Sequence, residues 1–204
     1  QDLLMNDFYT LTPAQQVEHI QAMAQKALLH WDIPDAGLEL ADHRENAVFC
    51  VSVDETTRCA LRIHRYGYHT DAALNSELVW IRALEKDGID VPQVVPTTAN
   101  ELFITVVSDG VPEPRQIDLF EWIDGEQLGA ATENLEDERA FARIYHTVGE
   151  ISAQLHNQAV TWTPPSGFTR HVWDVEGLTG EQPVWGRFWE HPALELSETT
   201  LVEK

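Results

Sequence analysis

Basic residues are scarce in this chain. Only 13 lysines and arginines stand against 34 aspartates and glutamates, which gives a formal net charge of −21. Such a charge repels nucleic-acid phosphates and anionic lipids unless a local basic patch intervenes, and the sequence shows none. We therefore expect neither a nucleic-acid nor a membrane partner. Two explanations of the charge stay open: a solubilising surface, as in an organism living in salt, and an acidic cleft for a cationic substrate.

Long apolar runs are also missing. No run approaches the roughly 20 residues that span a bilayer, and the start QDLLMNDFYTLTP lacks the basic-then-apolar pattern of a signal peptide. We expect a cytoplasmic protein. With 204 residues, of which 43% are hydrophobic, the chain is long enough to bury a core.

Cysteine is nearly absent as well. Cys50 and Cys59 flank a short polar turn at 54–57, so antiparallel pairing would bring them near each other. Cytosolic thiols stay reduced, and buried cysteine serves as a small hydrophobe, so both are predicted to be structural. The nine histidines show no metal-ligand spacing, so no metal site is predicted in this chain.

Apolar periodicity predicts an α+β fold with a five-stranded antiparallel sheet. Thr12, Pro13 and Gln15 have the pattern of a capping box and open a helix to about Trp31. Thr70 or Asp71 caps a second helix that ends near Asp87. A third and longer helix is expected over about 135–159, and strands are expected at 37–41, 47–53, 58–65, 101–107 and 116–122.

An arginine inside an apolar strand is followed by a glutamate on the next helix. Arg62 lies in the strand RCALRIHR, and Glu77 lies in DAALNSELVWIRALEKDG. In phosphoryl transfer a cation on a strand contacts the nucleotide phosphates and is oriented by a carboxylate on the neighbouring helix. The spacing fits this arrangement, and equally fits an exposed strand arginine with a solvated glutamate.

Five segments carry a resemblance to a known family. They read ENAVFCVSVDETTRCALRIHR, SELVWIRALEKDGIDVPQVVPT, IDLFEWIDGEQLG, LHNQAVTWTPPSGFTRHVWDVEGLTG and PVWGRFWEHPAL. Together they resemble the phosphotransferase family that includes aminoglycoside phosphotransferases, choline kinases and type II homoserine kinases, in a bacterial branch. The resemblance implies a protein-kinase-like fold, ATP and magnesium as co-substrates, and a small hydroxylated molecule as acceptor.

The resemblance also implies a nucleotide site. Arg62 takes the position of the phosphate-contacting cation, with Arg65 as the alternative, and Glu77 would orient it. Glu121, Trp122 and Ile123 fall at the hinge, where the backbone recognises adenine. The loop 42–46 has no glycine, so Asn46 is the candidate that lies near the nucleotide there.

The family's catalytic motifs are absent from this chain. His171-Val172-Trp173-Asp174 has one residue too many to match the His-x-Asp loop, Thr179 stands where an asparagine is expected, and the segment 174–177 is no convincing metal motif. Ser197 can cap a helix from Glu198, and only seven residues follow Ser197. We therefore expect an N-terminal portion of a kinase: a small lobe over 1–123, the start of a helical lobe over 124–204, and catalytic and metal-binding groups beyond Lys204.

The segment 161–194 holds four of the seven tryptophans. Trp173, Trp185 and Trp189, with Asp174, are candidates for a wall of the substrate cleft, because aromatic faces receive cations or sugars. The alternative is that the tryptophans anchor this segment to the lobe beneath it.

Three interpretations remain from the sequence, of which the third is an acidic structural domain whose resemblance to the family is accidental. The first is the N-terminal part of an ATP-dependent small-molecule kinase. The second is a non-catalytic nucleotide-binding or interaction module with a kinase-like scaffold. Substrate identity and oligomeric state do not follow from the sequence.

Overall fold

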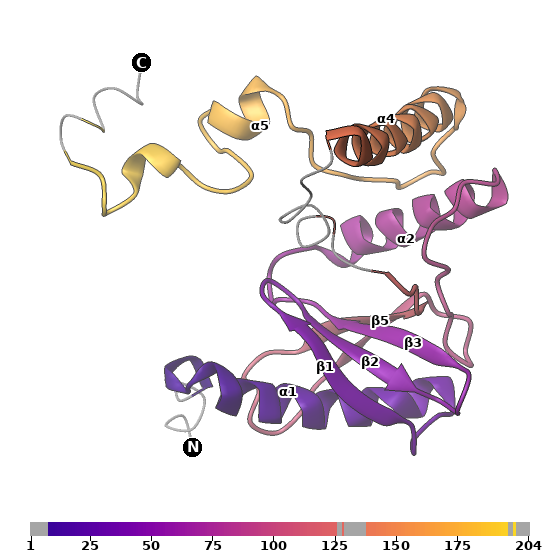
Figure 1. Cartoon of the computed structure of the whole chain (residues 1–204). Coiled ribbons are helices and arrows are strands. Elements are labelled where there is room, and N and C mark those ends of the chain that lie inside the picture. The colour runs from indigo at the N-terminus through magenta and orange to yellow at the C-terminus, as the bar shows by residue number, and fades with distance from the viewer. Residues whose placement is uncertain (1–7, 126–127, 129–137, 196–197, 199–204) are drawn as a thin grey trace. The chain divides into compact units, whose positions relative to one another are not determined.

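The computed structural model describes residues 8–125, 128, 138–195 and 198 (Figure 1). Two compact units are present, residues 1–168 and residues 169–204. The predicted lobe boundary at 123/124 falls inside the first unit and stays a prediction. The helix predicted from Glu198 lies, apart from Glu198 itself, outside the described residues.

The first unit contains a five-stranded antiparallel sheet, in the order β1-β2-β3-β5-β4. The strands are β1 (Gly37–His43), β2 (Ala47–Ser52), β3 (Arg58–Ile63), β4 (Phe103–Val106) and β5 (Arg115–Glu121). All five predicted strands are present, so the predicted α+β class is confirmed. The register of β1 against β2 shifts between Leu40 and Asp42, an irregularity that the sequence did not indicate.

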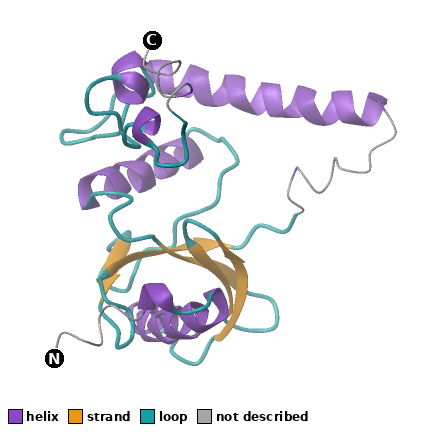
Figure 2. Cartoon of the chain, turned by 90° about the vertical axis from the view of Figure 1, so that its left-hand side faces the viewer, coloured by secondary structure: helices purple, strands orange, loops and turns teal. Residues whose placement is uncertain are grey.

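Helices pack on both faces of the sheet. α1 (Pro13–Ala27), continued by η2 (Leu28–Trp31) and preceded by η1 (Phe8–Thr10), covers one face, and α2 (Asp71–Lys86) lies over the other (Figures 1 and 2). The main core lies between α1 and the sheet and includes Met23, Phe49, Leu61 and Ile117. A smaller cluster joins α2 to the opposite face through Leu74, Leu78, Val94 and Phe120.

Local hydrogen bonds begin both helices where the sequence predicts. The Thr12 side chain accepts from the Gln15 N–H, and the Gln15 side chain accepts in return from the Thr12 N–H at 3.1 Å. At the second helix the Thr70 hydroxyl accepts from the Ala73 N–H at 3.2 Å. Gly88 follows α2 with a φ of 80°, a left-handed conformation that glycine adopts without a steric penalty.

The β2–β3 turn fixes the register that places Arg62. One oxygen of Asp54 accepts from the N–H groups of Thr56 and Thr57, each at 2.8 Å. The hydrogen bond from the Thr56 backbone is the largest of the effects that lower the pKa of Asp54 to about 2. Cys50 and Cys59 are free thiols on either side of this turn. Cys50 pairs with Ala60 and Val51 with Cys59, so the two thiols lie on opposite faces of the sheet.

A long helix, α4 (Glu138–Thr161), completes the described part of the first unit. Residues 135–137 of the predicted helix lie outside the described residues. Its C-terminal end packs on α2. The Gln158 amide accepts from Trp80 Nε1 at 3.0 Å and donates to Asp87 Oδ2 at 2.9 Å, and the rings of Trp80 and Trp162 stack with centroids 6.5 Å apart. No helix in the described part of the chain is long and apolar enough to cross a membrane.

The described part of the second unit, residues 169–195 and 198, has little regular structure. It contains α5 (Val175–Thr179) and the short helix η3 (Phe188–Glu190). Asp174 caps α5, because its side chain accepts from the Gly177 N–H at 2.7 Å.

Candidate functional site

The sheet face toward α2 carries the candidate site. Arg62 in β3 pairs with Val48 on one side and with Asp118 on the other, and Ala60 pairs with Phe120. Side chains alternate between the two faces of a strand, so these five residues project from the same face, opposite the main core. The apolar residues between them, such as Leu61 and Leu119, are buried in that core.

Arg62 is held by two carboxylates. Its Nε and Nη2 donate to the two oxygens of Asp118 at 3.0 and 2.7 Å, and Nη2 also donates to Glu77 Oε1 at 2.9 Å. The side chains of Arg62, Glu77 and Asp118 are 23%, 18% and 0% exposed. The contact predicted between Arg62 and Glu77 is therefore present. The alternative, in which Arg62 is exposed and Glu77 is solvated, does not hold, because both side chains are mostly buried.

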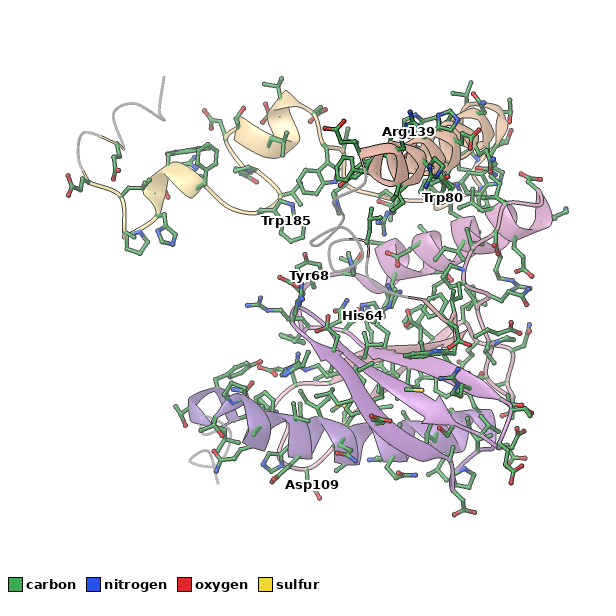
Figure 3. All side chains as sticks on the ribbon, in the orientation of Figure 1. His64, Tyr68, Trp80, Asp109, Arg139 and Trp185 are labelled. Carbon is green, nitrogen blue, oxygen red and sulfur yellow. The ribbon has the colours of Figure 1, made fainter. Side chains whose placement is uncertain are left out.

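Asp118 is the member of this cluster that sequence analysis missed. It lies opposite Arg62 in β5 and also accepts from His64, whose Nε2 is 3.0 Å from Asp118 Oδ2. His64 follows the end of β3 and is also buried (Figure 3). The available signal was the acidic residue within the apolar run Ile117-Asp118-Leu119-Phe120, since an aspartate in a buried strand requires a partner.

The pairing keeps the cluster ionised. Burial is the largest single effect on Asp118 and raises its pKa, but the hydrogen bonds and charges of His64 and Arg62 together outweigh burial and lower the pKa. Burial is again the largest single effect on Arg62, and it lowers the pKa. Asp118 and Glu77 together outweigh burial, so the pKa of Arg62 lies above the ordinary value. A guanidinium is protonated at every physiological pH in any case.

One nitrogen of Arg62 remains available. No hydrogen bond joins Nη1 to any described residue, whereas Nε and Nη2 are both used by carboxylates. The guanidinium carbon also lies 5.0 Å from the centroid of the Phe120 ring. Two carboxylates and one ring therefore fix the guanidinium, and its Nη1 can still donate to an external oxyanion.

A pocket of about 330 Å³ lies beside Arg62. Its walls are mainly apolar, which suits a flat ring system. The lining residues come from β2, β3, α2, the segment before β4, and the end of β5 with the residues after it: Val48, Ala60, Arg62, Ile81, Pro92, Phe120, Glu121, Trp122 and Ile123. Glu121, Trp122 and Ile123 were predicted from the sequence, and the apolar walls were not.

Two of the three backbone N–H groups of residues 121–123, at the edge of the pocket, already have hydrogen-bond partners. The Glu121 N–H donates to Gln93 O at 2.9 Å, and the Trp122 N–H donates to Arg58 O at 3.1 Å. The Ile123 N–H has no hydrogen bond to another described residue. Among residues 121–123, the Ile123 N–H is therefore the backbone group that can donate to a ligand.

Asn46 has a local contact. It lies between β1 and β2, and its side-chain oxygen accepts from the Arg65 N–H at 3.2 Å. Neither Asn46 nor Arg65 is among the residues that line the pocket beside Arg62. Arg65 lies beyond the end of β3 and is exposed. The structure thus brings Arg62, not Arg65, to this pocket, and the predicted proximity of Asn46 to nucleotide stays a prediction.

The predicted substrate residues lie in the second unit. The rings of Trp173 and Trp185 are 5.9 Å apart, and His171 contacts both of them edge-on. Trp173 is 61% and Trp185 46% exposed. Trp189 packs edge-on against Phe188 at 5.0 Å. Asp174 uses one oxygen to cap α5.

The described residues suit a nucleotide better than a metal ion. The apolar pocket, the free Ile123 N–H and the free Arg62 Nη1 are the groups that a base and its phosphates require. Among the described residues no group of three or more histidine, cysteine, aspartate or glutamate side chains could hold a metal ion. Two of the nearby carboxylates, Glu77 and Asp118, already bind Arg62.

The five-stranded antiparallel sheet with helices on both faces is the fold of kinase-like phosphotransferases. Residues 37–198 match the sequence model of the phosphotransferase enzyme family, and the chain belongs to this family.

Two solved structures and one curated relative resemble the chain. A microcompartment-associated aminopropanol kinase shares 36% identity with a TM-score of 0.73, over 89% of this chain and 53% of that protein. Amicoumacin kinase, solved in complex with AMP-PNP, Ca²⁺ and Ami, shares 16% identity with a TM-score of 0.60, over 79% of this chain and 47% of that protein, a likeness of fold alone. An uncharacterised protein of Deinococcus radiodurans is 32% identical over 108 residues, 53% of this chain and 28% of that protein. The chain spans about half the length of these kinases.

Proposed function

We propose that this chain forms the nucleotide-binding part of an ATP-dependent small-molecule kinase. The kinase transfers the γ-phosphoryl group to a hydroxyl group, or a similar acceptor, of a small metabolite or aminoglycoside-like substrate. The observation that carries the proposal is the fixed Arg62 guanidinium beside the apolar pocket, with Nη1 free to donate. The aminopropanol kinase, whose name gives a small-molecule substrate, supports the same class.

Each group has a distinct role in nucleotide binding. Val48 and Ala60 contact one face of the adenine, and the Ile123 N–H donates to its edge. Arg62 Nη1 donates to a phosphate oxygen, while Asp118 and Glu77 hold the guanidinium plane. Magnesium, when bound, would neutralise charge on the phosphates during transfer. Among the described residues no group of three or more histidine, cysteine, aspartate or glutamate side chains could hold it.

The candidate residues for binding the acceptor lie in the second unit. Trp173 and Trp185 present exposed aromatic faces, and such faces attract cationic groups. An acceptor bearing an amine fits these faces and the acidic composition of the chain. We place the protein in the cytoplasm, where ATP is available.

The test is a titration of the chain with adenosine and with magnesium ATP, followed by thermal unfolding. Binding to the folded state stabilises it by about 2.7 kcal/mol at a ligand concentration of 100 Kd. Ala60→Phe fills the pocket and is expected to abolish stabilisation by both ligands. Arg62→Ala leaves the pocket open and is expected to reduce the affinity for ATP to that for adenosine.

Ala41→Phe is the matched control, because it adds the same ring to an exposed position on β1. Circular dichroism establishes that each variant is folded before its binding is compared. The nucleotide site would be wrongly placed if Ala60→Phe bound ATP as well as the parent chain. A non-catalytic module predicts the same binding, without phosphoryl transfer by the whole protein.

A further inference from the structure

A second pocket lies at the end of the sheet where β1 turns into β2. It has a volume of about 340 Å³ and is lined by η1, α1, the β1–β2 turn, the residues after β3 and the start of β5. Three arginines line it, Arg44, Arg65 and Arg115, together with the apolar side chains of Phe8, Ile20 and Ile63. We call it the arginine pocket. It shares no lining residue with the pocket beside Arg62.

Arg115 is buried there with incomplete pairing. Its side chain is 9% exposed, and Nη2 donates to Glu113 Oε2 at 3.3 Å and to the Tyr9 hydroxyl oxygen at 3.2 Å. The same Glu113 oxygen also accepts from the Tyr9 hydroxyl at 2.8 Å, so one acceptor serves two donors. Arg115 Nε is buried and has no partner among the described residues.

His64 contributes a second unpartnered nitrogen to the lining. Its Nε2 must donate to the ionised Asp118, which can only accept, and its Nδ1 has no partner among the described residues. Buried polar atoms in folded proteins nearly always have a partner, and those without a protein partner commonly contact a water or an ion. Arg115 Nε is a donor, and its missing partner is an acceptor such as an oxyanion, whereas His64 Nδ1 is an acceptor when Nε2 carries the ring proton and needs a donor such as water.

Three arginines and one carboxylate, Glu45, line the pocket, and this excess of positive charge indicates an anionic molecule. Arg65 is exposed at the pocket rim and forms no ion pair with a described residue, and Arg44 has Asp42 at 3.5 Å. In a chain with a net charge of −21, a concentration of three arginines is unusual, and the sequence alone showed no basic patch. Guanidinium groups bind carboxylates and phosphates by two parallel hydrogen bonds.

We propose that the arginine pocket binds a small organic oxyanion, a carboxylate or phosphate on a short apolar body. The oxyanion accepts from Arg65 and Arg115, and the apolar body contacts Phe8, Ile20 and Ile63. This site is separate from the nucleotide pocket and does not depend on the proposed kinase activity.

The test follows the arginine Nε–H signals of the ¹⁵N-labelled chain by NMR. The probes are butanoate, inorganic phosphate and, as an uncharged match for butanoate, butanamide. Saturable shifts of the Arg65 and Arg115 signals with butanoate or phosphate, and none with butanamide, are expected. Butanoate alone would assign a carboxylate ligand, and phosphate alone a phosphorylated one.

Arg65→Gln is expected to weaken binding of the anion about tenfold, the loss of one charged hydrogen-bonding group. Arg58→Gln removes the same charge from the other end of β3 and should leave binding unchanged. Equal shifts with butanamide, or no saturable shift, would mean that the pocket holds only water. Displacement of the anion by AMP-PNP would make the pocket part of the nucleotide site. Each of these three results overturns the proposal.

Discussion

Asp118 links most of the polar contacts around Arg62. Its carboxylate is inaccessible to solvent and contacts both Arg62 and His64. We expect Asp118→Asn to lower the free energy of unfolding by about 3–5 kcal/mol, because it leaves the Arg62 charge partly uncompensated in a buried position. Urea unfolding at neutral pH measures this loss.

The same substitution should change the acid limb of the stability profile. Because the folded pKa of Asp118 is lowered, its stabilising contribution is present above the unfolded value of about 3.9 and is lost as pH falls through the folded value. Asp118→Asn should therefore flatten the decrease in stability below about pH 4. Asp124→Asn is the control, since Asp124 pairs with Arg58 at 2.6 Å but is 79% exposed, and its loss should cost under about 1 kcal/mol. Equal losses in the two variants would contradict the role given to Asp118.

The residues of the site were predictable to different extents. Arg62 and Glu77 are 15 positions apart and stand on consecutive elements, so element type and order were enough to pair them. Asp118 is 56 positions from Arg62, and its contact depends on β5 pairing with β3 across the sheet. Sequence periodicity identifies strands but not their neighbours. The free Ile123 N–H depends on the partners that Glu121 and Trp122 take, which no local pattern contains.

At the scale of elements, a single amide makes two hydrogen bonds between α4 and the region of α2. Gln158 is buried and bridges Trp80 and Asp87, which both belong to or adjoin α2 (Figure 3 labels Trp80). Gln158→Ala should lower the free energy of unfolding by about 1–3 kcal/mol, because two buried partners lose their hydrogen bonds. Hydrogen exchange should increase in the last turns of α4 and in the second half of α2.

Gln154→Ala is the matched control, since Gln154 lies one turn earlier on α4 and is exposed. It should leave both stability and exchange nearly unchanged. If Gln154→Ala and Gln158→Ala had the same effect, the loss would reflect the helix and not its contact with α2.

Element bounds were predictable where local chemistry sets them. The caps Thr12 and Thr70 are hydrogen-bonded as their sequence context indicates, and both helices begin directly after them. Strand ends were less well predicted: the first strand runs on to His43, and the third ends at Ile63 instead of continuing to Arg65. Strand ends depend on cross-strand partners, and the register shift between Leu40 and Asp42 is one such tertiary effect.

At the scale of the molecule, the net charge of −21 should make stability depend on salt. Self-repulsion weakens as ions screen it. Raising sodium chloride from about 0.05 M to about 1 M should stabilise the chain by roughly 1–2 kcal/mol, which corresponds to a rise in Tm of about 3–6 °C. Differential scanning calorimetry measures the shift.

Sucrose at the same osmolality is the control, because an excluded osmolyte strengthens burial without screening charge. A rise of equal size in sucrose would assign the effect to burial. A Tm independent of salt would mean that local ion pairs already offset the repulsion.

The two cysteine thiols lie on opposite faces of the sheet and differ in their accessibility to reagents. Cys59 lies in the main core, where burial is the largest effect that raises its pKa, so its thiol is a poor nucleophile. Cys50 is half-buried on the opposite face, directly across from Ala60 in the wall of the pocket beside Arg62. An alkylating reagent therefore has one accessible target in the folded chain. That target lies next to the pocket beside Arg62, so a covalent label or an irreversible ligand can be attached there without engineering a new cysteine.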